Sequence, residues 1–291
     1  MRVVAMLLLV CVPSQHAIAW GQEGHSIIAE IAQRRLSATA AAAITSILNP
    51  DPSAPRYATP TLASIATWAD EVRYNGAQKN ETYNWHFVDI PRLDTRYDPA
   101  TECPKEHPEL GDCVINELAR LRHELRCTSG EQQLRALKFA VHFDGDIHQP
   151  FHTIWEKNGG NGISVKLAFT GTTCSNQLCS TPRDNLHKVW DTTLIRAIQY
   201  NWQTLVDDLE NGWLKSSDAA ADHEDDPVKW AEAAHNEALA RNIWVEDGAI
   251  LDQAYYDRAV PVVTRQLGLA GLRLARYLND VLGSTQCPYA N

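Results

Sequence analysis

Apolar residues recur at helical intervals through most of this chain. In several segments they stand three or four positions apart, a spacing that places them along one face of an α-helix. The clearest stripes are Leu118, Leu121 and Leu125, then Leu134, Leu137 and Val141, and finally the leucines and valines between Ala249 and Leu282. A further helical pattern begins near Ile27 and continues through alanine-rich sequence to Leu48, where Asn49-Pro50 ends it. The whole pattern predicts a mainly α protein.

One segment alternates with the period of a β-strand instead. Ile163, Val165, Leu167 and Phe169 are separated by more polar residues and follow a turn-forming sequence at residues 158–162. We therefore expect a small β-hairpin. Proline and glycine gather at residues 49–60, 91–111 and 157–183, but none of these loops resembles a linker between domains. The chain is predicted to be a single-domain helical bundle with a small β-hairpin.

Residues 1–19 form a separate unit. They contain one early cation, Arg2, an apolar run from Val3 to Val12, and small residues in the pattern Ala17-Ile18-Ala19. These features are typical of a cleaved secretory signal, and the apolar run is too short to span a bilayer. A first helix of the fold is the weaker alternative, because Pro13 interrupts the run. We expect a signal peptide at residues 1–19, a mature domain at residues 20–291, and a secreted or periplasmic protein.

The chain is acidic, with a formal net charge of −10 that becomes −11 once its single signal-peptide cation, Arg2, is removed. A broad basic face for duplex nucleic acid is therefore not expected. Any attraction for phosphate must come from a local source such as bound metal. Outside the N-terminal run no segment is apolar enough to cross a membrane, and the sequence implies no protein partner.

Six of the seven cysteines remain after Cys11 leaves with the signal, and an even number in an exported chain favours disulfides. Six cysteines allow many disulfide pairings, and we expect two bonds that close short loops and one long-range bond. The three pairs are Cys103–Cys113, Cys174–Cys179 and Cys127–Cys287. Cysteine ligation of zinc is the weaker alternative, because the sequence contains no C-x2-C pair.

The densest chemistry lies at residues 142–152, His-Phe-Asp-Gly-Asp-Ile-His-Gln-Pro-Phe-His. His142 and Asp146 are four positions apart at the end of an apolar helical stripe, so both should project from one face. Pro150 ends that helix and lets His152 approach from another direction. Imidazole nitrogen and carboxylate oxygen are both ligands of zinc.

A second His-x3-Asp pair occurs at His187 and Asp191, within an apolar frame. A single pair of this kind is more often a surface hydrogen bond or a satisfied core histidine than a metal site. Two pairs, with His152 beside the first, favour a zinc centre over that alternative.

Further motifs extend the pattern toward the N-terminus. Trp20-Gly21-x-x-Gly24-His25 follows the predicted cleavage point, and WADEVR places Asp70 and Arg73 on one helix. Together with NWHFVDIP, HFDGDIHQPFH, GGN and LHKVWD, in this order, these segments resemble the zinc-dependent type I nucleases. That family contains the single-strand-specific mould nucleases and the plant bifunctional nucleases. The resemblance runs from Trp20 to about residue 280 and implies a phospholipase C/nuclease-like helical fold.

The resemblance implies three Zn²⁺ ions with nine ligands. One set is Trp20 (free amine and carbonyl oxygen), His25 and Asp146; a second is Asp70, His86 and His142, sharing Asp146; the third is His152, His187 and Asp191. The Trp20 amine exists only after cleavage behind Ala19. Three zincs and three aspartates would leave a local charge of roughly +3, which suits a phosphodiester in an acidic protein.

The resemblance also assigns roles beside the metals. Asp70 would position or deprotonate the attacking water, and Arg73 would pair with a phosphate oxygen. Phe87 would stack on an unpaired base, Asp89 would hydrogen-bond the edge of that base, and Asn161 would touch substrate. From the sequence alone, Arg73 fits a solvated helix charge equally well, Phe87 a core residue and Asn161 a turn residue.

The implied activity is that of an endonuclease that cleaves single-stranded DNA and RNA to 5′-phosphorylated products, with 3′-nucleotidase activity as a further expectation. Its partners would be single-stranded nucleic acid and nucleotides. A zinc phospholipase C is the nearest alternative, although those enzymes usually carry Glu where Asp191 stands. A non-catalytic zinc-storage protein is another. The chain departs from the family pattern at Asp144, which would add negative charge near the metals.

Overall fold

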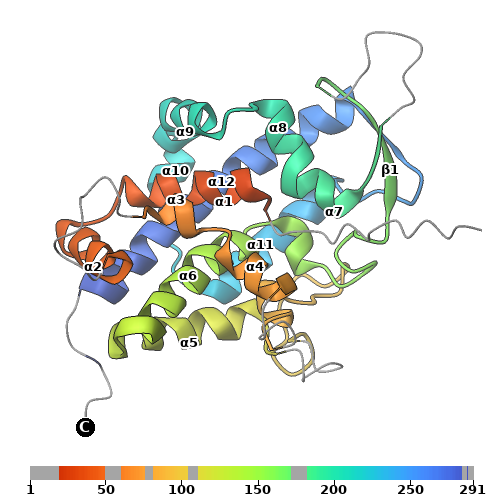
Figure 1. Ribbon diagram of the computed structural model, residues 1–291. Helices are drawn as coiled ribbons and strands as arrows, with labels where there is room; N and C mark the ends of the chain where they lie inside the picture. The colour runs from red at the N-terminus through yellow and green to blue at the C-terminus, as the bar shows by residue number, and fades with distance from the viewer. Residues whose placement is uncertain are drawn as a thin grey trace, which may run out of the picture.

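The computed structural model describes residues 20–49, 60–75, 81–103, 111–171 and 182–283, together with Cys287; the predicted signal peptide lies outside these residues. Helices dominate the structure, as predicted (Figure 1). The longer ones are α1 (Gln22–Gln33), α2 (Ala38–Leu48), α5 (Val114–Cys127), α6 (Gly130–Ile147), α9 (Trp202–Asn211), α11 (Pro227–Ala240) and α12 (Gln253–Gly283). Shorter ones are α3 (Leu62–Ile65), α4 (Trp68–Asn75), α7 (Leu186–Lys188), α8 (Leu194–Ile198) and α10 (Ser217–Ala221). The described segments also contain the 3-10 turns η2 (Asn84–His86), η4 (Pro150–Thr153) and η6 (Trp213–Lys215) and the π-turn η5 (Val189–Thr193).

The longest helix, α12, is the element around which several others pack. α1 lies along it, and α2, α5, α6 and α8 also contact it (Figure 1). Leu267, Leu274 and Leu278, spaced by seven and four residues, are fully buried in this contact region. A Cβ atom on Gly271 would lie only 2.4 Å from the Ile31 side chain, so α1 can approach this closely because residue 271 is glycine. Pro261 lies within α12 without ending it.

The helical pattern expected from residue 27 to residue 48 is divided between α1 and α2. The Ser37 hydroxyl oxygen accepts a hydrogen bond from the Ala40 N–H at 3.2 Å and so caps α2. This bond satisfies an N–H group that the first helical turn leaves without a partner, which lets a new helix begin. The Ser37 N–H in turn donates to Asn279 Oδ1 of α12 at 2.7 Å and fixes the break in place.

The expected hairpin is present within a sheet of three strands. β1 (Ser164–Ala168) pairs antiparallel with β2 (Arg183–Asn185) and parallel with β3 (Ile250–Asp252), giving the order β2-β1-β3. The register pairs Ser164 with Asn185 on one side and Lys166 with Ile250 on the other. β3 takes the first residues of the segment for which the sequence predicts helix, because the edge of β1 offers them backbone hydrogen bonds.

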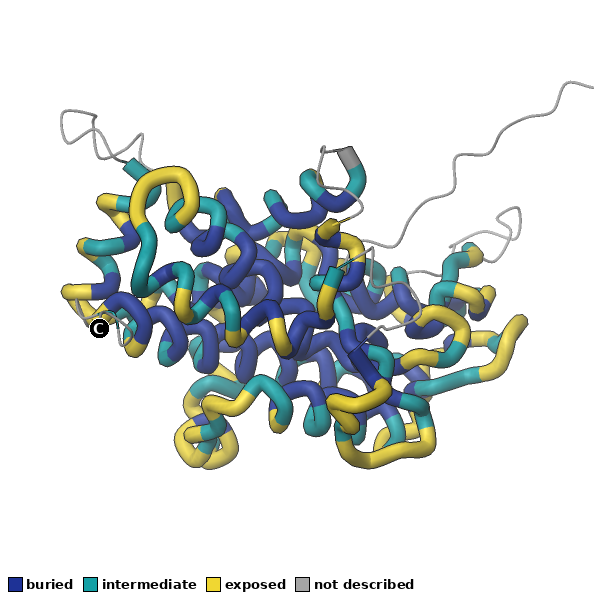
Figure 2. Tube along the Cα trace, turned by 90° about the horizontal axis from the view of Figure 1, so that it is seen from below, coloured by how far each residue is buried: buried dark blue, intermediate teal, exposed yellow. Residues whose placement is uncertain are grey.

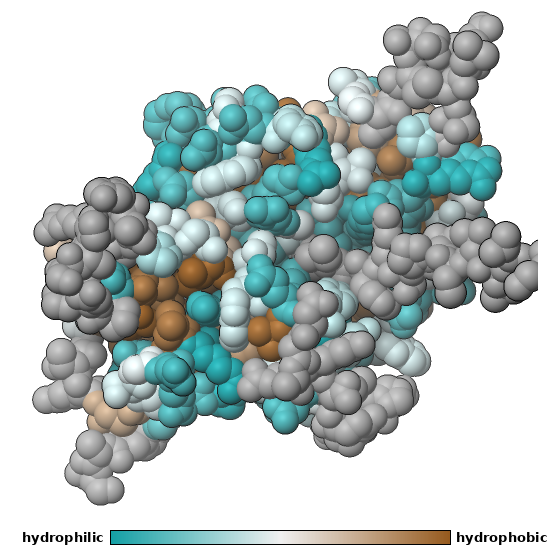
Figure 3. All heavy atoms as spheres, viewed as in Figure 1, coloured by the Kyte–Doolittle hydropathy of each residue, from teal (hydrophilic) through white to brown (hydrophobic). Residues whose placement is uncertain are grey.

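Burial is concentrated in the central helices, and the exposed residues lie on outer turns and loops and on the outward sides of the peripheral helices (Figure 2). α6 is almost wholly buried from Ala136 to Ile147, on all sides of the helix. Hydrophilic residues cover most of the described atoms on the face shown in Figure 3, with hydrophobic patches between them. None of the helices in the described segments combines the length and the apolar composition needed to span a bilayer.

Two of the three predicted disulfides are formed, Cys103–Cys113 and Cys127–Cys287. The second joins the end of α5 to the residues that follow α12. The predicted Cys174–Cys179 pair lies outside the described residues.

Candidate metal centre

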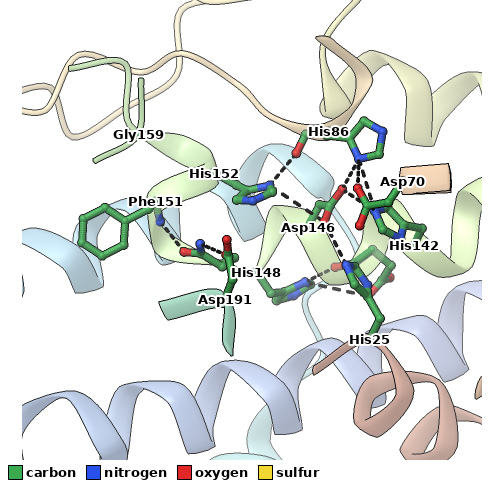
Figure 4. Close-up of polar contacts among 12 residues, drawn as sticks. His25, Asp70, His86, His142, Asp146, His148, Phe151, His152, Gly159 and Asp191 are labelled. Carbon is green, nitrogen blue, oxygen red and sulfur yellow. Dashed lines mark hydrogen bonds and ion pairs between the residues drawn. The ribbon is translucent and has the colours of Figure 1, made fainter. Parts of the chain in front are cut away.

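The side chains predicted to bind metal converge on the C-terminal half of α6 (Figure 4). This helix contributes His142 and Asp146; the side chains that meet them are His25 from α1, Asp70 from α4, His86 from η2, His152 from η4, and His187 and Asp191 from α7 and η5. All eight are buried, with exposures of 6% or less. Residues far apart in the sequence thus form one enclosed polar cluster.

Four side chains place one donor atom each around a common point. His86 Nδ1 and His142 Nε2 lie 3.2 Å apart, and Asp146 Oδ2 lies 2.9 Å from the first and 3.2 Å from the second. Asp70 Oδ1 lies 3.7 Å from His86 Nδ1 and 3.6 Å from His142 Nε2. Zinc about 2.0–2.1 Å from four tetrahedral ligands would hold those ligands roughly 3.3–3.4 Å apart. The five distances, 2.9–3.7 Å, scatter around this spacing, and the donor atoms of His86, His142 and Asp146 form one compact group that could hold a metal ion.

The Asp146 carboxylate faces two groups at once. Its Oδ2 belongs to the set just described, whereas its Oδ1 lies 3.3 Å from His25 Nε2 and 3.9 Å from His152 Nδ1. The His25 ring stacks on the His142 ring, with centroids 3.8 Å apart. A carboxylate whose two oxygens face different donor groups is suited to bridge two cations.

His152, His187 and Asp191 form a third group. His187 Nε2 lies 3.5 Å from Asp191 Oδ2, and the ligand atoms of all three residues lie within 4.8 Å of one another. His187 belongs to α7 and Asp191 to η5, so the pair spans the start of a π-helical turn instead of one regular α-helix. Gln149 Nε2 donates to Asp191 Oδ1 at 2.7 Å and leaves Oδ2 directed at His187. Gln149 was not among the predicted residues, although it stands within the densest motif.

Backbone carbonyls orient three of the imidazoles. Their Nδ1–H groups donate to main-chain oxygens 2.6–2.7 Å away: His142 to Ala66, His152 to His86, and His187 to Gly159. A proton on Nδ1 leaves the lone pair on Nε2, where a metal can accept it. These carbonyls could not be recognised from the sequence. Ala66 and Gly159 have no polar side chain, and His86 was assigned a role through its ring.

The Gly159 carbonyl is presented by an unusual turn. Residues 157–160 all have positive φ angles, of 54°, 52°, 58° and 82°, and two of them are not glycine. A Cβ atom on Gly159 would lie 2.2 Å from the Phe151 oxygen and 3.2 Å from His187 Nδ1. Asn161 Nδ2 donates to the Asn158 oxygen at 2.9 Å and helps to close the turn. The GGN segment therefore has a structural role in holding His187, and contact of Asn161 with substrate stays a prediction.

Burial and neighbouring charges set the protonation of the imidazoles. Burial lowers the pKa of His86 and of His187 to about 3, so both are neutral at pH 7, the form that binds metal. For His142 burial acts in the same direction, but the Asp146 and Asp70 carboxylates outweigh it and raise the pKa to about 10. The two carboxylates thus draw positive charge to this point.

Buried polar atoms that lack a hydrogen-bond partner gather in the same cluster. They include both ring nitrogens of His25, both oxygens of Asp70, Oδ1 of Asp146, Nε2 of His152 and Oδ2 of Asp191. Each such atom costs about 1–3 kcal/mol unless something satisfies it. Bound cations would satisfy the carboxylate oxygens and one nitrogen of each imidazole, and this mixed set of nitrogen and oxygen donors is one that zinc uses.

Trp20 lies directly before α1, with its side chain fully buried. The Gly21 N–H donates to the Asp191 backbone oxygen at 2.7 Å, and the His25 N–H to the Gly21 oxygen at 3.2 Å. These bonds hold the start of the domain beside the third ligand group. Ligation by the Trp20 amine stays a prediction, since Ala19 lies outside the described residues.

Arg73 and Phe87 lie at the edge of the cluster. Arg73 is buried, at 7% exposure, which argues against a solvated helix charge. Phe87 and Asp89 are partly exposed and Val88 between them is buried, so the first two turn to the outer side of this extended segment. Phe87 is therefore not a fully buried core residue.

Asp144 and His148 turn away from the metal ligands, toward α12. His148 Nδ1 donates to the Asp144 backbone oxygen at 2.6 Å, and its Nε2 accepts from Arg273 Nη1 at 3.0 Å. Burial raises the pKa of the Asp144 carboxyl well above its usual value, against the opposing charges of Arg273 and Arg276. The expectation that Asp144 adds negative charge near the metals is not supported by this arrangement.

Comparison with known proteins gives one consistent result. The family model described as S1/P1 Nuclease matches residues 20–283. Nuclease P1 of Penicillium citrinum is 30% identical over 91% of this chain and 98% of its own length. Endonuclease 2 of Arabidopsis thaliana is 29% identical over 97% of each chain, and Nuclease S1 of Aspergillus oryzae is 29% identical over 93% of this chain and 94% of its own.

Proposed function

The chain belongs to the S1/P1 nuclease family, and from this membership we propose a zinc-dependent endonuclease that cuts single-stranded DNA and RNA to 5′-phosphorylated products. The observation that best supports the zinc dependence is the convergence of buried donor atoms from Asp70, His86, His142 and Asp146, with separations of 2.9–3.7 Å. We further propose three zinc ions, bound by the three ligand sets that the family resemblance implies. Trp20 and His25 would form the first of these sites with Asp146, and His152, His187 and Asp191 would form the third.

The chain's own residues would divide the remaining chemistry. Bound zinc would lower the pKa of a water molecule and would also supply positive charge for the phosphate. Asp70 has both oxygens without a hydrogen-bond partner, and one of them can orient the attacking water. Arg73, one turn further along α4, would hold a phosphate oxygen through its planar guanidinium.

Phe87 and Asp89 would form the base site. Stacking needs an unpaired base and tolerates any sequence, which gives a physical reason for single-strand preference. The zinc phospholipase C alternative is not favoured, because the matching family and the relatives above are nucleases. A zinc-storage protein would have no need for a buried arginine beside its ligands.

We also propose export with cleavage before Trp20. Residues 1–19 have the composition of a secretory signal, and the two disulfides are typical of proteins that leave the cytosol. Cleavage would create the amine that the family resemblance assigns to zinc.

The proposal is tested by initial rates on single-stranded DNA, the matching duplex and phosphatidylcholine. We expect cleavage of the single strand at least about tenfold faster than the duplex, since stacking is worth several- to about a hundredfold. Chelation should abolish the activity and added zinc should restore it. Cleavage of phosphatidylcholine without cleavage of DNA would overturn the proposal.

The base site has its own test in Phe87→Ala. We expect kcat/KM on single-stranded DNA to fall roughly 5- to 150-fold, because one stacking contact worth about 1–3 kcal/mol is lost. A baseless diester, bis(p-nitrophenyl) phosphate, should be affected much less, and zinc content should not change. Equal losses on both substrates would show that Phe87 only supports the neighbouring His86.

A further inference from the structure

Arg73 is a buried cation that makes cation–π contacts with aromatic rings in the described part of the chain. No described carboxylate forms an ion pair with it, and its Nε has no hydrogen-bond partner. A buried guanidinium is costly unless an anion or the face of a π system compensates its charge. Aromatic rings therefore compensate the charge of Arg73, and its guanidinium can still bind an anion.

The ring of Tyr83 is the nearest of these rings. Its centroid lies 4.3 Å from Arg73 Cζ, compared with 5.4 Å for Tyr74 and 5.9 Å for Phe87. Tyr83 directly precedes η2, and its ring meets that of Phe87 edge to face, at 6.2 Å and 84°. With 39% of its surface exposed, Tyr83 stands at the rim. One side chain thus contacts both the proposed phosphate-binding residue and the proposed base-binding residue.

We propose that Tyr83 is a positioning residue, which holds the Arg73 guanidinium by a cation–π contact and so sets the affinity for the substrate phosphate. The inference rests on the proposed nuclease function and adds a residue to which no role was assigned from the sequence. A ring that covers one face of a guanidinium leaves the N–H groups along its edge free to donate. It also restricts a long side chain that would otherwise lose rotamer freedom when phosphate binds.

The test compares Tyr83→Leu with Tyr83→Phe. Leucine keeps apolar bulk but removes the ring face, so KM should rise about 2- to 30-fold on single-stranded DNA and on bis(p-nitrophenyl) phosphate alike, with kcat nearly unchanged. Phenylalanine keeps the ring face and should restore KM to within about twofold of the wild type. Tyr200→Leu is the matched control, since Tyr200 is an exposed tyrosine in the connection between α8 and α9.

A double-mutant cycle with Arg73→Gln shows whether Tyr83 acts through Arg73. In the Arg73→Gln background, Tyr83→Leu should have no further effect on KM. A loss confined to DNA would instead make Tyr83 a base-stacking residue, and a fall in zinc content or Tm would make it structural; either result overturns the proposal. If the wild type fails to cleave single-stranded DNA, the proposed function fails. If the wild type is active and Tyr83→Leu has wild-type KM, the inference about Tyr83 alone fails.

Discussion

Two faces of α6 carry the same residue types and satisfy them differently. His142 and Asp146 stand four positions apart on one face, and Asp144 and His148 stand four apart on a face about 200° away. All four side chains are completely buried. On the first face the donor atoms converge and several lack partners. On the second face His148 has a partner at each ring nitrogen, and the Asp144 carboxyl oxygens lack one.

The two faces differ in the source of positive charge. Behind Asp144 and His148, Arg273 pairs with Asp222 at 2.7 Å, and Arg276 pairs with the same carboxylate at 2.6 Å. On the other face, no lysine or arginine among the described residues forms an ion pair with Asp70 or Asp146. The carboxylates of the first face therefore have histidines but no lysine or arginine as ion-pair partners in the described structure, which favours a metal site there. The contrast between the faces yields three predictions.

The largest effect is expected for Asp146→Asn. An amide cannot supply two anionic oxygens to two cations, so zinc content should fall from the proposed three ions to one. kcat/KM on single-stranded DNA should fall by about 10⁴-fold, roughly 5–6 kcal/mol of transition-state stabilisation. Zinc analysis of the purified variant, with rates at saturating zinc, measures both.

Asp144→Asn is the matched control for that variant, two residues earlier on the same helix. It should keep the zinc content of the wild type and nearly wild-type activity, because Asp144 faces α12. Loss of zinc in Asp144→Asn would show that the two faces are not independent. Loss of a single zinc in Asp146→Asn would contradict the inference that Asp146 bridges two zinc ions.

The second prediction concerns the arginine side of α6. Asp222→Asn should lower the free energy of unfolding by about 3 kcal/mol at pH 7, because Arg273, 5% exposed, loses its carboxylate partner. Burial alone would raise the pKa of Asp222, but Arg273 and Arg276 outweigh it and hold the pKa below its usual value. The wild-type advantage should therefore be complete above about pH 5 and shrink as the pH falls below about 4. Urea unfolding at pH 7, 5 and 3.5 tests this, and an advantage that does not depend on pH would contradict it.

The smallest effect, of opposite sign, is expected for Asp144→Asn. Burial raises the pKa of Asp144, and neither carboxyl oxygen has a hydrogen-bond partner. The carboxyl group therefore lowers the free energy of unfolding as the pH rises above its pKa in the unfolded chain, which is about 4. Asparagine has no such dependence and should stabilise the protein by about 1 kcal/mol at pH 7, with the gain vanishing toward pH 4. The same urea series measures it. A destabilised variant at pH 7 would mean that ionised Asp144 is needed to balance Arg273 and Arg276.

Much of the fold and of the metal centre could be predicted because the signals are local or belong to a recognised family. The stripes at residues 118–125 and 134–141 predicted α5 and α6, and the His-x3-Asp spacing with the family motifs singled out the side chains that the structure brings together; their binding of metal stays a prediction. The π-turn that carries Asp191 could not be foreseen, because its residues show the same apolar spacing as an α-helix.

The remaining features depend on contacts between distant parts of the chain. β3 has three residues, too few for an alternating pattern, and it forms only because β1 lies beside it. The separation of Asp144 from the metal face depends on Arg273, 129 positions along the chain, and on where α12 packs. Tyr83 looks ordinary in the sequence, and only its 4.3 Å contact with Arg73 gives it a role.

The packing of α1 along α12 has a consequence for the order of events during synthesis. α1 has 12 residues, a length at which an isolated helix is marginal in water, and the surface that stabilises it belongs to the last helix made. His25 lies on α1, so its place in the cluster is established only when nearly the whole chain has been synthesised. The complete cluster can therefore form only after most of α12 has left the ribosome, at the end of synthesis.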